Sequence, residues 1–121
     1  MASMKLSGQP PFEFLHREDL SNLPISAKDY EVNLHGGFAI DVQDGGQIYY
    51  GMPGCGIMRV DSDLKHQEII RLPIDLEALN FHATEIGEFD GNRRLLLPAN
   101  EDEKVVVITL DGQIDFILPR P

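Results

Sequence analysis

Two histidines occupy matching places in the chain and are its best candidates for chemistry. His35 lies in the stretch NLHG at positions 33–36, and His82 lies in the similar stretch NFHA at positions 80–83. Neutral imidazoles that converge on one point suit a divalent metal such as zinc. The pattern therefore predicts a metal site that includes His35 and His82. The alternative is that each histidine hydrogen-bonds the backbone of a neighbouring element and holds the two stretches in register.

Further polar residues lie where they could support such a site. Asn33 and Asn80 each stand two residues before a histidine, where a side-chain amide either caps a turn or orients the imidazole. Glu85 could act as a carboxylate ligand or as a general base, and the alternative is a solvated residue on a channel wall. The same two interpretations hold for Asp41. The sequence has no HExxH or paired CxxC motif, so it assigns no catalytic residue and no other cofactor-binding residue.

Other reactive residue types have simpler explanations. Cys55 lies in a PGCG turn with no base near it in the sequence, which predicts a structural role. The acidic run at 101–103 lacks the alternating ligand spacing of a calcium loop, so we expect a solvated loop. Arg93 and Arg94 begin a predicted strand, where they are expected to offset nearby acids such as Glu88.

The elements that would position these residues are short β-strands. From position 29 onward, short apolar runs are separated by glycine and aspartate turns, which is typical of strands. Segments recur after 46 to 47 residues: DGG at 44–46 matches DGN at 90–92, and IIRLP at 69–73 matches DFILP at 115–119. A period of that size, filled by about four strands, is typical of β-propeller blades.

The fold class predicted is therefore all-β, with two consecutive four-stranded antiparallel propeller blades after an irregular N-terminal lead-in. The strands are expected at 37–42, 47–51, 56–61, 67–72, 83–88, 93–97, 104–110 and 113–118. One helical turn is expected at 73–79, between the blades. The predicted divisions are the lead-in at 1–28, the first blade at 29–74 and the second blade at 75–121.

Charge and composition exclude several kinds of partner. The chain has 20 acidic and 10 basic residues and a formal net charge of -10, so its surface repels nucleic acids and anionic membranes. Its single cysteine cannot form an internal disulfide. The sequence contains no signal-peptide core and no apolar run long enough to span a membrane, so we expect a soluble chain whose compartment is not indicated.

Three stretches resemble the blades of six-bladed β-propellers of the NHL-repeat kind, including a poorly characterised bacterial branch. They are LHGGFAIDVQDGGQIYYG, NFHATEIGEFDGNRRLLLPAN and VVVITLDGQIDFILPRP. The resemblance covers about residues 29–121 and implies a propeller of which this chain holds two blades. NHL-like amidating lyases hold a channel zinc with histidines from several blades, so the resemblance also implies a metal role for His35 and His82.

Two functions are expected on this basis. The parent propeller would be a metal-dependent hydrolase or lyase with channel histidines, or else a protein- or glycan-binding module with structural histidines. Two blades alone leave apolar strand faces uncovered, so we expect either a fragment of a longer propeller or self-association that completes a ring. We expect no independent catalysis, and the sequence does not specify a small-molecule, peptide or glycan ligand.

Overall fold

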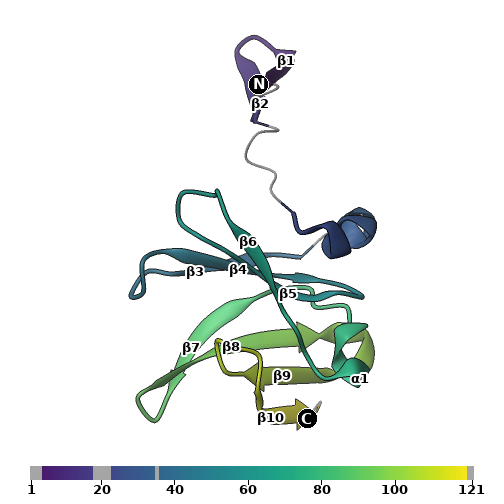
Figure 1. The fold of residues 1–121 in the computed structure, drawn as a ribbon, viewed down its shortest axis with the longest axis vertical. Coiled ribbons are helices and arrows are strands. Elements are labelled where there is room, and N and C mark those ends of the chain that lie inside the picture. The colour runs from purple at the N-terminus through teal and green to yellow at the C-terminus, as the bar shows by residue number, and fades with distance from the viewer. Residues whose placement is uncertain (1–3, 18–22, 35, 120–121) are drawn as a thin grey trace.

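Two four-stranded antiparallel sheets make up most of the protein (Figure 1). The computed structural model describes residues 4–17, 23–34 and 36–119. The first sheet contains β3 (Phe38–Asp41), β4 (Gln47–Met52), β5 (Gly56–Val60) and β6 (Gln67–Ile70). The second sheet contains β7 (Glu85–Phe89), β8 (Asn92–Ala99), β9 (Lys104–Ile108) and β10 (Ile114–Pro119). Every strand pairs with the one that follows it in the chain, so both sheets are meanders.

These elements confirm the all-β class and the eight predicted strands. No strand end differs from its predicted position by more than two residues. The helical turn expected between the two sheets is also present as α1 (Ile74–Glu77), and a short 3-10 helix, η3 (Asn100–Asp102), joins β8 to β9. Gly45 and Gly46 adopt positive φ angles of 71° and 76° in the turn between β3 and β4. Glycine adopts such angles without a steric clash, which explains why the DGG stretch at 44–46 predicts this turn.

The N-terminal lead-in is not irregular, and this part of the prediction is wrong. β1 (Met4–Gln9) and β2 (Phe12–Arg17) form an antiparallel hairpin around a cis bond between Pro10 and Pro11. A nine-residue 3-10 helix, η2 (Ile25–Asn33), then leads to the first sheet. The sequence does not predict this hairpin because its turn consists of two prolines. The usual sequence signal for a hairpin is an asparagine or aspartate followed by glycine.

The two sheets pack against each other through an apolar core. The strand register places Tyr49, Ile57 and Ile70 on the face of the first sheet that meets the second, which we call its inner face. The second sheet contributes completely buried side chains to the same core, namely Leu95, Leu97, Val106 and Ile108. Burying one such side chain stabilises the fold by about 1.5–3 kcal/mol, so this core dominates the attachment of one sheet to the other.

The first strands of the two sheets meet at a tight junction. β3 contacts β7, and the backbone N–H of Gly37 donates a hydrogen bond to the carbonyl oxygen of His82 at 3.3 Å. A Cβ atom on Gly36 would lie 2.7 Å from the carbonyl oxygen of Phe81, closer than real contacts allow. Glycine at position 36 therefore permits the close approach of the two matched stretches.

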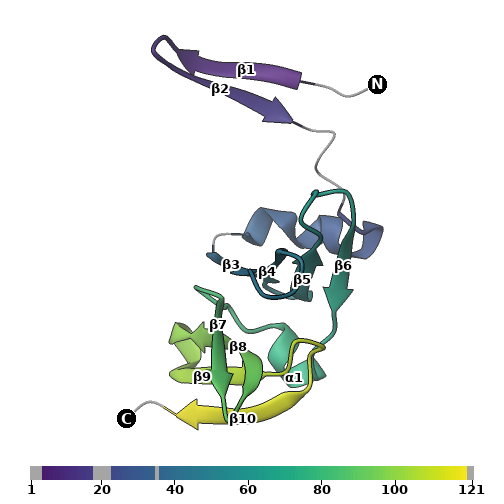
Figure 2. The same ribbon diagram turned by 90° about the vertical axis from the view of Figure 1, so that its left-hand side faces the viewer.

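The outer face of the first sheet, opposite its inner face, is covered only in part. η2 lies over one portion, where Ala27 and Leu23 pack with Met52, Cys55 and Met58. Figures 1 and 2 show the β1–β2 hairpin beyond this face, standing clear of both sheets. Nothing in the described ranges is a helix long and apolar enough to cross a membrane.

Candidate functional site

His82 joins the two sheets through its backbone. Its N–H donates to the carbonyl oxygen of Pro98 at 3.1 Å, and its own carbonyl oxygen accepts from the N–H of Gly37. The side chain is exposed, at the beginning of the segment that enters β7. The bond to Gly37 therefore connects the two matched stretches, whereas the bond to Pro98 stays within the second sheet.

Two of the residues predicted to support the histidines, Asn80 and Glu85, have described side chains. Asn80 donates from Nδ2 to Oε1 of Glu101 at 3.3 Å, so it connects the segment before β7 to the acidic loop after β8. Its Oδ1 atom is buried and has no hydrogen-bond partner among the described residues. Glu85 is the exposed first residue of β7, and Asn33 is the last residue of η2.

His35 lies outside the described residues, so the predicted metal site stays a prediction. In the ranges that the structure describes, no three histidine, cysteine, aspartate or glutamate side chains gather closely enough to hold a metal ion. The residues described around His82 therefore do not fit a zinc site by themselves, because such a site needs at least three protein ligands.

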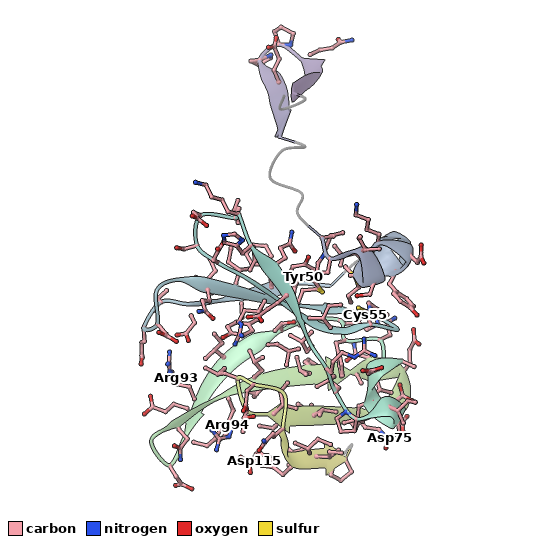
Figure 3. The ribbon with its side chains drawn as sticks, viewed as in Figure 1. Tyr50, Cys55, Asp75, Arg93, Arg94 and Asp115 are labelled. Carbon is pink, nitrogen blue, oxygen red and sulfur yellow. The ribbon has the colours of Figure 1, made fainter. Side chains whose placement is uncertain are left out.

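An ion pair between the sheets joins Asp41 to Arg93, and Figure 3 labels the arginine. The Asp41 side chain is only 2% exposed, and its Oδ1 accepts from Nη1 of Arg93 and from the N–H of Gln43. Asp41 comes from the end of β3 and Arg93 from the start of β8. Removal of one partner from such a buried pair is strongly destabilising, because it leaves the other charge uncompensated.

Neither arginine uses the acids that lie near it in sequence. Arg93 pairs with Asp41, and Arg94 donates from Nε to Oδ2 of Asp115 at 3.0 Å. The register of β7 and β8 also places Glu88 opposite Arg93, although the ion pairs of the two arginines go to Asp41 and Asp115. Arg93 reaches across to the first sheet, whereas Arg94 reaches from β8 to β10 within the second sheet, so neither partner is close in the sequence.

Cys55 has the surroundings of a structural thiol. It is buried between the first sheet and η2 (Figure 3), and its backbone N–H donates to the carbonyl oxygen of Met52 at 2.9 Å. Burial raises the pKa of the Cys55 thiol, while the nearby charge of Arg71 lowers it by a smaller amount. A protonated, covered thiol is a poor nucleophile, which supports the structural role predicted for Cys55.

One open concavity lies on the outer face of the first sheet. Its volume is about 320 Å³, and its lining is mainly apolar: Leu34, Gly36, Phe38, Ile48, Tyr50, Val60, Leu64 and Gln67. Two polar groups in this lining pair with each other: Oη of Tyr50 donates a hydrogen bond to Oε1 of Gln67 at 2.7 Å. We call this concavity the outer groove.

The outer groove borders the part of the sheet that η2 covers. Tyr50 belongs to both surfaces, since it lines the groove and also packs against the cluster beneath η2. At the edge strand β3, Phe38 is 64% exposed and Ile40 is 49% exposed. This groove was not predicted from the sequence, although strands with apolar residues on both faces are a usable signal for it.

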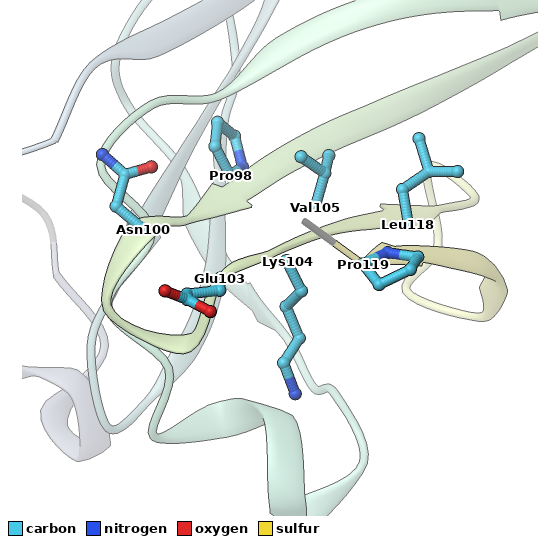
Figure 4. A pocket seen from close by; sticks show the side chains of 7 residues that line it. All are labelled: Pro98, Asn100, Glu103, Lys104, Val105, Leu118 and Pro119. Atoms are coloured by element: carbon cyan, nitrogen blue, oxygen red, sulfur yellow. The ribbon is translucent and has the colours of Figure 1, made fainter. Parts of the chain in front are cut away.

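A second concavity of about 450 Å³ lies at one end of the second sheet, beside η3 (Figure 4). It combines apolar and oppositely charged side chains: Pro98, Asn100, Glu103, Lys104, Val105, Leu118 and Pro119. Because this lining mixes apolar, amide, acidic and basic groups, it selects no one chemical class of ligand.

The fold thus defines a protein of two packed β-meanders with an apolar outer groove. No protein-family model matches the chain, and neither a curated protein nor a solved structure shows significant similarity to it.

Proposed function

We propose that the chain is a pair of propeller-type blades that acts as a protein-association module without catalysis of its own. Two features of the fold support the blade interpretation. Each sheet is a four-stranded meander, and the first strands of the two sheets lie in contact at their matched ends. Successive propeller blades are arranged in this way around their axis.

The open part of the outer face of the first sheet, which includes the outer groove, is the observation that carries the association function. Soluble monomers rarely leave a contiguous apolar surface on a sheet open to water. Here the outer groove continues to the exposed side chains of Phe38 and Ile40 on the edge strand β3. Such a surface binds another polypeptide by burying apolar area, which also excludes water from the strand edge.

Sedimentation of the full chain over a range of concentrations tests this proposal. We expect the wild type to associate and Phe38→Asp to associate at least about tenfold more weakly, since the charge would have to be buried in the contact. Ile74→Asp is the matched control, because Ile74 is 89% exposed on α1 and does not line the groove. Equal association of wild type and Phe38→Asp would refute the proposal.

A second measurement separates this function from the metal-dependent hydrolase or lyase. The association module predicts that His82→Ala leaves association unchanged, because His82 does not line the outer groove. Metal that copurifies with the chain in a fixed ratio and is lost in His82→Ala would favour the enzyme instead.

A further inference from the structure

The backbone of the β1–β2 hairpin stands clear of both sheets, and the outer groove is open among the described residues. An isolated two-stranded hairpin is at best marginally stable in water, because it has no second layer to bury its apolar residues. Figures 1 and 2 show this hairpin clear of both sheets. The outer groove is an apolar surface without a cover. Each could provide the layer that the other lacks.

We propose that the outer groove binds the β1–β2 hairpin of a second copy of this chain, and that the exchange is reciprocal. The inference rests on the proposed function, since it names the occupant of the same association surface. Two copies related by a two-fold axis would each donate one hairpin and receive one. This is domain exchange of a terminal element, a common route to homodimers.

The position of η2 favours a hairpin over a larger occupant. η2 and Leu23 already cover the portion of the outer face beside the groove. A complete four-stranded sheet would have to displace this helix, whereas a two-stranded hairpin needs only the strip that stays open. The groove also continues the apolar cluster beneath η2 through Tyr50, so a docked hairpin would extend an existing core.

The direction in which the hairpin extends favours a second copy as its receiver. Both views place the hairpin on the same side of the molecule as the outer face, but beyond it. A second copy that turns its outer face toward the first would meet the hairpin there. The strand β2 carries Phe12, Phe14 and Leu15 in its sequence, which supplies apolar residues for an apolar groove.

The test compares one substitution on each side of the proposed contact. Phe38→Asp alters the groove and Phe14→Asp alters the hairpin, while Ile74→Asp serves as the control away from both. We expect the wild type and Ile74→Asp to be dimers, and each of the other variants to dimerise at least about tenfold more weakly. Circular dichroism and thermal unfolding of every variant show whether the sheets remain folded.

Mixing the two weakened variants identifies the exchange directly. A chain with Phe38→Asp keeps an intact hairpin, and a chain with Phe14→Asp keeps an intact groove. One of the two exchanged contacts is therefore restored in the mixed dimer, and we expect a one-to-one complex that neither variant forms alone at the same concentration. Absence of that complex would overturn the reciprocal exchange.

Other outcomes separate this inference from the proposed function. If Phe38→Asp abolishes association and Phe14→Asp does not, the groove is an association surface but the hairpin is not its occupant. If the wild type remains a monomer at about 1 mM, both proposals fail. A monomer in which the hairpin is protected from proteolysis by its own groove would likewise overturn exchange between copies.

Discussion

Alanine substitutions at two neighbouring glycines test the junction between the repeated units. A Cβ atom at position 36 would lie 2.7 Å from the carbonyl oxygen of Phe81, while one at position 37 would meet nothing within 4 Å. Overpacking against a fixed backbone group costs about 1–3 kcal/mol. Either change also restricts the unfolded chain, which stabilises the native state by about 0.4–1 kcal/mol where the backbone conformation allows alanine. Gly37→Ala should therefore be neutral or slightly stabilising, and Gly36→Ala should be less stable than Gly37→Ala by about 1–3 kcal/mol.

Urea denaturation of the two variants and the wild type measures this difference in the free energy of unfolding. The two variants share the same chemical change in adjacent positions, so effects on the unfolded chain nearly cancel between them. Equal stability of Gly36→Ala and Gly37→Ala would refute the contact between the stretches at 36–37 and 81–82. It would also remove the main support for treating those stretches as structurally matched.

Two further substitutions and one chemical modification test the electrostatics of the described residues. Arg93→Met should lower the free energy of unfolding by about 3–5 kcal/mol, because it leaves the buried Asp41 carboxylate uncompensated; a loss below about 1 kcal/mol in urea denaturation would contradict a buried pair. The backbone N–H of His66 lowers the pKa of Asp61, so this carboxylate contributes stability above pH 4 or so that is lost as the pH falls through its folded pKa. Asp61→Asn should therefore show a smaller drop in thermal midpoint on acidification, and an unchanged profile would count against this role. Cys55 should react with a thiol reagent about tenfold or more slowly in the native protein than in urea, whereas equal rates would show that the thiol is accessible.

The sequence was most informative at turns, where the residue type determines the backbone conformation. Turns rich in glycine and aspartate separate the strands, and the positive φ angles at Gly45, Gly46 and Gly112 explain why those residue types appear there. All eight strands of the two sheets could therefore be predicted. The hairpin around Pro10 and Pro11 could not, because two prolines carry no comparable signal for a turn that reverses the chain.

Side-chain contacts between residues far apart in the sequence were harder to predict than the strands themselves. The partner of Arg93 is Asp41, and the hydrogen bond of Asn80 goes to Glu101 and not to a neighbouring histidine in the sequence. Both contacts depend on how the folded strands and loops pack together. The alternation of apolar and polar residues within one strand does not specify that packing. The outer groove likewise arises from residues on several strands and from the limited area that η2 covers.

The Asp41–Arg93 pair has a consequence for the kinetics of folding. It joins residues 52 positions apart, whereas every strand pairing within the two sheets links consecutive strands. Local pairings form early because short loops close at a small entropic cost, so each meander can assemble before the two dock. An interaction absent from the transition state affects the rate of unfolding and leaves the folding rate nearly unchanged. The ion pair should therefore slow the separation of the two docked sheets, with little influence on how fast they dock.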